Sequence, residues 1–166
     1  MTLDRLPSRR ALNFLGFAVC CGLMGFALFA QHVLLLDPCP LCVFQRVAVI
    51  SIGIIFLIAA LHNPSGAGRI VYSVLLGVAA IAGGIVAGRH AWLQQLPPDK
   101  VPSCGPGLDY MLETLPFTDV LSTVFTGSGE CAEIVWQFLG LSMPAWVLVW
   151  MAGIGIGGIW NNLRRG

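Results

Sequence analysis

Charged residues are scarce in this chain of 166 residues: nine lysines and arginines and eight acidic residues together make up 10 % of it. Hydrophobic residues make up 57 %, and the mean hydropathy is +0.82. This composition excludes an ordinary soluble domain and indicates an integral membrane protein. The formal net charge is only +1, and no basic arm or patch is present, so we expect no nucleic-acid partner.

Apolar runs long enough to cross a bilayer occur at about residues 11–31, 43–62, 70–89 and 144–160. Each should be a helix, because lipid offers no partner for unpaired backbone groups. The first run is too long for a signal peptide and no A-x-A cleavage site follows it, so we interpret it as an uncleaved span. The sequence therefore predicts one all-α membrane domain over residues 1–166, a four-helix transmembrane bundle.

Glycine and alanine are frequent in the third and fourth apolar runs. Gly84 and Gly88 have small-xxx-small spacing, as do Gly153 and Gly157, and this spacing lets helices approach closely. We predict that these four glycines are packing positions.

Arginines flank the spans unevenly, and this bias predicts the orientation of the chain. They cluster at the N-terminus, in the 63–69 loop and at the C-terminus: Arg5, Arg9, Arg10, Arg69, Arg164 and Arg165. These segments, and so both termini, should be cytoplasmic. The loops at about 32–42 and 90–143 should face outward, and they hold seven of the eight acidic residues.

Four of the six cysteines fall in the outward loops. Cys39 and Cys42 form a C-x-x-C at the outer end of the second span, and Cys104 and Cys131 lie in the long loop. The other two, Cys20 and Cys21, lie within the first span, where a free cysteine is usually a small buried hydrophobe.

The outward cysteines allow three interpretations. A zinc site is disfavoured, because only one C-x-x-C is present and zinc ribbons normally supply two. Two structural disulfides would staple the loops of a non-catalytic membrane protein in an oxidising compartment. A redox relay would instead pass electrons by thiol–disulfide exchange.

The surroundings of Cys42 favour the relay. A disulfide across a C-x-x-C closes a tiny loop and is a poor staple. In the first turn of a helix, Cys42 would be stabilised as a thiolate by free N–H groups and the macrodipole. Arg46 lies one turn deeper on the same face, and an arginine inside a span is a functional candidate. It would pair with the Cys42 thiolate, polarise a ligand carbonyl, or only extend to the head groups.

The relay needs an electron acceptor, and the sequence has no haem motif, no dinucleotide fingerprint and no iron–sulfur cysteine set. A lipid-soluble quinone would reach Cys42 laterally without any such motif.

The long loop contains an amphipathic segment, "FTDVLSTVF" at residues 117–125. Its apolar residues have helical spacing and predict a short interfacial helix on the outer leaflet, or a lid on the bundle. Such a helix would keep Cys131 near Cys39. The proline- and glycine-rich stretch 97–107 around Cys104 should be extended and mobile.

Four segments together resemble the bacterial disulfide bond formation protein B (DsbB) family: "QHVLLLDPCPLCVFQR", "RHAWLQ", "SCGPGLDYMLE" and "SGECAEIVWQFLGLSMPAW". The resemblance implies a protein-dithiol:quinone oxidoreductase in the bacterial inner membrane, with its cysteines on the periplasmic side. Its partners would be a DsbA-like thiol oxidant, the membrane quinone pool (ubiquinone or menaquinone) and the lipid bilayer.

The resemblance also implies roles for matching residues. Reduced DsbA would attack a Cys104–Cys131 disulfide at Cys104, and the freed Cys131 would attack Cys39 of a Cys39–Cys42 disulfide. Cys42 would then be released beside the quinone. Arg46 and His90 would bind the quinone, and no metal is expected.

Overall fold

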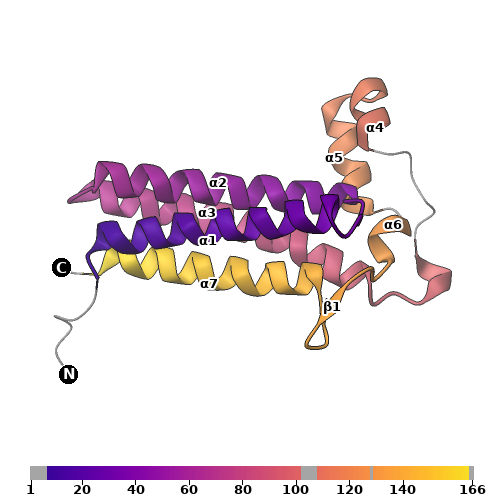
Figure 1. Ribbon diagram of the computed structural model, residues 1–166. Helices are drawn as coiled ribbons and strands as arrows, with labels where there is room; N and C mark the ends of the chain where they lie inside the picture. Colours follow the sequence, from indigo (N-terminus) through magenta and orange to yellow (C-terminus); the bar gives the residue numbers. More distant parts are fainter. Residues whose placement is uncertain (1–6, 102–107, 128, 165–166) are drawn as a thin grey trace.

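Four long helices form a bundle in the computed structural model, which describes residues 7–101, 108–127 and 129–164 (Figure 1). All four are long and apolar enough to cross a membrane: α1 (Arg9–His32), α2 (Pro40–His62), α3 (Ala67–Leu93) and α7 (Met143–Leu163). The predicted all-α fold with four spans is confirmed. Each helix extends past the apolar run that predicted it at one or both ends.

Local sequence signals set the helix ends. The Ser8 hydroxyl accepts a hydrogen bond from the Ala11 N–H (3.2 Å) and caps α1. α2 begins at Pro40, where the missing N–H of proline has no cost. It ends at His62 and is capped by Asn63, a residue type that tolerates the left-handed conformation found there (φ +44°). The short connection from Asn63 to α3 makes α2 and α3 antiparallel neighbours.

The bundle core is apolar, and so is its outer surface. α3 packs most extensively against α7, and α1 against α2. The middle of the bundle holds a cluster of buried side chains: Cys20, Val49, Ile52, Phe56, Leu76, Ala80 and Met151. Val78, Ile81 and Ile156 on the outside are more than 60 % exposed. Such side chains need lipid around them, which fits a membrane-spanning bundle.

The glycines that bring the helices together are not the predicted ones. A Cβ added at Gly155 would lie 2.7 Å from the Cβ of Ala80, and one at Gly83 would lie 2.9 Å from that of Ala48. Gly158 is similarly tight. By contrast, an added Cβ would have no described neighbour within 4 Å at Gly88, Gly153 or Gly157, and would make only ordinary contact at Gly84. The prediction was wrong for Gly88, Gly153 and Gly157, which lie on other faces of α3 and α7, whereas Gly84 faces Leu148 of α7 without a close approach.

A polar layer joins the start of α1, the end of α7 and the start of α3. The side chains of Asn13, Asn161 and Asn162 are buried and hydrogen-bonded to one another. Arg69 donates to three carbonyls at the end of α7, those of residues 162–164. The described parts of the three basic segments therefore lie at one end of the bundle, as predicted. Which side of the membrane this end faces stays a prediction.

Short elements gather at the opposite end, called here the cysteine end (Figure 1). They are a 3-10 turn η2 (Pro98–Lys100), α4 (Leu108–Thr114), α5 (Phe117–Thr126), α6 (Gly129–Ala132), and the paired strands β1 (Gln137–Phe138) and β2 (Leu141–Ser142). The extended conformation predicted for 97–107 was wrong for the η2 turn. The remainder of that stretch, residues 102–107, lies outside the described residues.

The predicted amphipathic helix is confirmed as α5. Val120 and Val124 are buried and belong to a second apolar cluster with Leu41 and Leu93 of the bundle. The apolar side of α5 thus covers the bundle, as expected of a lid. Its position in the outer leaflet stays a prediction.

Candidate active site

The C-x-x-C pair is built on the first turn of α2. Cys39 is the N-cap residue, and its sulfur accepts a hydrogen bond from the Cys42 N–H at 3.4 Å. Pro40 occupies the first helical position. The Cys39 Sγ also donates to the Cys42 Sγ, 2.9 Å away. Cys42 therefore lies in the first turn, as predicted, where the helix dipole and a neighbouring thiol both favour a thiolate.

Cys131 of α6 lies beside this pair. It is 1 % exposed and belongs to the same apolar cluster as Cys39. Hydrogen bonds to Cys131 and to Cys42, together with burial, raise the pKa of the Cys39 thiol above its ordinary value. These contacts therefore favour the protonated form of Cys39. Cys104, the fourth predicted cysteine, lies outside the described residues.

His90 completes a cluster with the two sulfurs, called here the cysteine–histidine cluster (Cys39, Cys42 and His90). The ring is buried in the last turns of α3, and its Nε2 lies 3.7 Å from the Cys39 Sγ. Nε2 and both sulfurs lie within 4.8 Å of one another, a spacing that also suits a metal ion. On the other side of the ring, Nδ1 lies 2.9 Å from Nε2 of Gln45.

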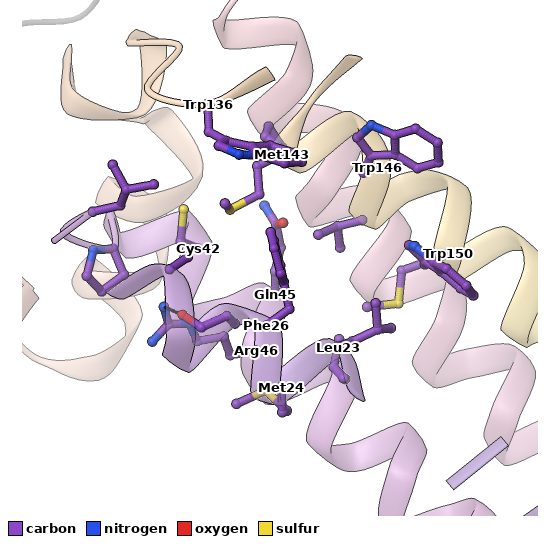
Figure 2. A pocket seen from close by; sticks show the side chains of 18 of the residues that line it. Leu23, Met24, Phe26, Cys42, Gln45, Arg46, Trp136, Met143, Trp146 and Trp150 are labelled. Carbon is purple, nitrogen blue, oxygen red and sulfur yellow. Dashed lines mark hydrogen bonds between the residues drawn. The ribbon is translucent and has the colours of Figure 1, made fainter. Parts of the chain in front are cut away.

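A cavity of about 370 Å³ begins at Cys42 and runs between α1, α2 and α7 (Figure 2). Its lining is mostly apolar, with Leu23, Met24, Val49, Met143, Val147 and Met151 among the residues that form it. Phe26 and Trp150 also line it and are each 42 % exposed, so the cavity reaches the outer surface between α1 and α7. Two of the side chains in the cavity wall are thus open to the surroundings of the bundle.

Aromatic side chains surround the cavity near the cysteine end. Phe26 of α1 meets Trp136 edge to face at 5.6 Å, and Trp136 stacks on Phe138 at 6.1 Å. The Trp146 indole N–H donates to the Phe138 carbonyl at 2.9 Å and holds β1 against α7. These contacts connect the segment after Cys131 to both helices of the lateral opening.

Arg46 lines the cavity one turn below Cys42 (Figure 2). Its guanidinium donates to α1, through Nη1 to the Gln31 side-chain oxygen at 2.5 Å and through Nη2 to the Ala27 carbonyl at 3.2 Å. Neither bond involves the sulfur of Cys42. The arginine is thus held in place at the cavity wall, with a positive charge beside a largely apolar space.

Of the predicted site residues, the structure brings Cys39, Cys42, Cys131 and His90 together, and it places Arg46 on the cavity side of them. His90 is not among the described residues that line the cavity. Gln45 and Gln31 were missed by sequence reasoning. An uncharged amide inside an apolar run was the available signal, since buried polar side chains in a span need partners. Of the two cysteines in α1, Cys20 is buried in the cavity wall as predicted.

The prediction of burial was wrong for Cys21, which is exposed. Its neighbour Cys20 faces the core, and consecutive residues on a helix point in directions about 100° apart.

Arg89 of α3 fixes the position of the loop. Its guanidinium donates to the carbonyls of Phe125 and Thr126, both at 3.0 Å, in the last turn of α5. It also lies over the Trp92 ring, 4.5 Å from the centroid. Because α6 and Cys131 follow α5 closely, this contact helps to place Cys131 at Cys39.

Comparison with known proteins identifies the family. A family model described as "Disulfide bond formation protein DsbB" matches residues 9–161. The chain is 52 % identical to "Disulfide bond formation protein B" of Hahella chejuensis over 153 residues, which is 92 % of each chain. It is 47 % identical to the protein of that name from Saccharophagus degradans over 165 residues, 99 % of each chain. The chain belongs to the DsbB family, and it is a multi-pass membrane oxidoreductase of disulfide bond formation.

Proposed function

We propose that this chain reoxidises a DsbA-type thiol oxidant and passes the electrons through two cysteine pairs to a membrane quinone. One observation carries the proposal: Cys42 belongs both to the cysteine–histidine cluster and to the wall of the cavity. Among the described cysteines, Cys42 would therefore contact a lipid-soluble acceptor in the cavity on one side and Cys39 on its opposite side.

The cavity has the properties that a quinone site requires. Its volume of about 370 Å³ lies within the usual range of about 300–1,000 Å³ for small-molecule sites. The apolar lining suits a ring with an isoprenoid tail, and the Arg46 guanidinium would hydrogen-bond a ring carbonyl oxygen. A bound quinone supplies an acceptor for two electrons and two protons and leaves as the quinol.

The thiol chemistry balances across the two pairs. A donor thiolate attacks the Cys104–Cys131 disulfide at Cys104, and Cys131 leaves as a thiolate. Cys131 then attacks the Cys39–Cys42 disulfide at Cys39, and Cys42 leaves as a thiolate at the cavity wall. The second thiol of the donor then attacks the donor sulfur of the mixed disulfide and releases Cys104, and Cys104 attacks the Cys39–Cys131 disulfide at Cys131 and releases Cys39. The Cys39 and Cys42 thiols pass two electrons and two protons to the acceptor and become a disulfide again, so in one full cycle the donor dithiol has become a disulfide.

The buried position of Cys39 supports this order of attack. Cys131 contacts Cys39, whereas Cys42 is turned to the cavity. Attack at Cys39 therefore releases the sulfur that lies nearest to the acceptor. We place His90 on the thiol side of Cys42, since its Nε2 faces the sulfurs.

The orientation of the chain completes the proposal. The arginine-rich end would face the cytoplasm of a bacterial cell, and the cysteine end would face the periplasm, where a DsbA-type donor could reach the loop. The site would then sit at the outer edge of the inner membrane.

The test is quinone reduction by the purified protein in detergent, followed by quinone absorbance after addition of reduced DsbA. Wild type should turn over, and Cys42→Ser should not. Cys21→Ser is the matched control, because Cys21 lies on the outside of α1, away from the cavity wall. If folded wild type reduces no quinone with any DsbA-type donor, or if Cys42→Ser retains full activity, the proposal is wrong.

A further inference from the structure

Gln45 is a buried polar side chain with no role in the proposed thiol relay. It is 4 % exposed and lies on α2, three residues after Cys42 and on the same helical face. Its amide reaches across to α3, where Nε2 lies 2.9 Å from His90 Nδ1. A buried amide needs a hydrogen-bond partner, and the His90 ring nitrogen is the partner that the structure gives it.

The contact between Gln45 Nε2 and His90 Nδ1 determines the tautomer of the His90 ring. An amide nitrogen can only donate, so Nδ1 of His90 must accept. A neutral imidazole that accepts at Nδ1 carries its proton at Nε2. Nε2 is the atom that faces the sulfurs, 3.7 Å from the Cys39 Sγ and within 4.8 Å of the Cys42 Sγ.

A proton at Nε2 has a consequence for the cysteine pair. A thiolate in an apolar cluster needs hydrogen-bond donors, and Cys42 already has the Cys39 thiol as one. An Nε2–H adds a second donor on the same side. With the opposite tautomer, Nε2 would present a lone pair to the sulfurs and repel the charge instead.

We propose that Gln45 is a positioning residue that fixes the tautomer of His90, so that the Nε2–H is directed at the Cys39–Cys42 pair and supports the Cys42 thiolate. The effect on turnover rests on the proposed function, but the tautomer does not. Gln45 contacts both the cavity and the histidine, so it can act on the thiolate through the ring.

The direct test is ¹⁵N NMR of histidine-labelled, thiol-reduced protein in detergent at a pH where histidine is neutral. The two ring nitrogens have different shifts in the two tautomers, and a His90→Asn sample identifies the His90 signals among those of the three histidines. Wild type should show the Nε2–H form. Gln45→Met, which keeps the size but loses the amide, should lose this preference, whereas His32 and His62 should not change.

A second variant keeps the test decisive if Gln45→Met does not fold. Gln45→Glu has the same shape, but its carboxylate can only accept, so His90 should switch to a proton at Nδ1. Gln95→Met is the matched control, because Gln95 is exposed near the end of α3, and it should leave the His90 signals unchanged. An Nδ1–H form in wild type, or a Gln45→Glu spectrum equal to that of wild type, would overturn the proposal.

Turnover provides an independent readout. Loss of one hydrogen bond to a charged sulfur predicts that Gln45→Met reduces quinone about tenfold more slowly than wild type and Gln95→Met. Unchanged turnover in a variant whose tautomer has shifted would contradict the link from tautomer to thiolate. The NMR experiment needs neither quinone nor donor, so its result is separate from that of the quinone assay.

Discussion

The contact between Arg89 and α5 predicts how firmly α5 is held on the bundle. The guanidinium donates two hydrogen bonds of 3.0 Å to carbonyls in the last turn of α5. Carbonyls at a helix end have no partners within the helix and attract a positive charge. The substitution Arg89→Met removes both bonds and the charge but keeps a long apolar stem.

The size of the expected loss in docking free energy follows from the type of hydrogen bond. A hydrogen bond to a charged group contributes about 1.5–3 kcal/mol, and the bond from Nη2 is exposed and so lies at the low end or below it. We expect Arg89→Met to weaken the docking of α5 by about 2–3 kcal/mol, which corresponds to roughly 30- to 150-fold more frequent opening. Arg89→Lys keeps the charge but cannot make the bidentate contact, and it should lose about half as much docking free energy as Arg89→Met.

Amide hydrogen exchange measures this directly. Exchange in α5 should accelerate in Arg89→Met by the factor given above, while exchange in the middle of α7 stays constant. Arg10→Met is the matched control, since Arg10 is an exposed arginine at the opposite end of the bundle. If α5 exchanges at the wild-type rate in Arg89→Met, the reasoning that this arginine holds the loop is refuted.

Three further predictions concern the cavity, the packing and the metal alternative. Arg46→Met should slow quinone reduction at least about tenfold and Arg46→Lys less, with little change in thermal unfolding, because loss of a costly, partly buried charge inside a span offsets the lost bonds to α1. Equal rates for both variants and wild type would contradict this. Gly155→Ala should lower the free energy of unfolding by about 1–3 kcal/mol, because its Cβ would lie 2.7 Å from that of Ala80. Gly157→Ala, with no described neighbour within 4 Å, should raise it slightly or leave it unchanged, and equal losses in denaturant titrations would refute the packing argument. Chelator treatment should leave quinone reduction unchanged, whereas metal found by mass spectrometry and lost together with activity would favour a zinc site at the cysteine–histidine cluster.

The spans and the position of Cys42 were predictable because their causes are local. The length and hydrophobicity of a run decide whether it crosses a membrane. Pro40 fits only the first turn of a helix, so α2 begins there and Cys42 falls in that turn. The helix α5 was predictable from the spacing of its apolar residues alone.

The packing glycines were not predictable, because spacing does not fix the rotation of a helix about its axis. α7 has four glycines between residues 153 and 158, and only the pair Gly153 and Gly157 among them has the small-xxx-small spacing, so the pattern selected that pair. The neighbouring helix selects Gly155 and Gly158, which are buried. Such a choice depends on contacts between distant parts of the chain.

The partners of the polar side chains in the site were hidden for the same reason. Arg46 contacts residues of α1 that precede it by 15 and 19 positions, and Gln45 contacts His90, 45 positions later. Sequence reasoning found that Arg46 was exceptional, but it left the partner open. The hydrogen-bond partner of the Gln45 amide can be identified only when α2 and α3 are placed side by side.

Cysteine trapping in a variant with both Cys42→Ser and Cys104→Ser tests the central claim most directly, namely that Cys131 enters the relay through Cys39 and leaves Cys42 facing the cavity. Mild oxidation of this variant followed by peptide mapping should give a Cys39–Cys131 disulfide in high yield. The matched variant with Cys39→Ser and Cys104→Ser should form Cys42–Cys131 much more slowly. If Cys42 is linked to Cys131 as readily as Cys39, or if neither is linked in folded protein, this order of electron transfer is contradicted.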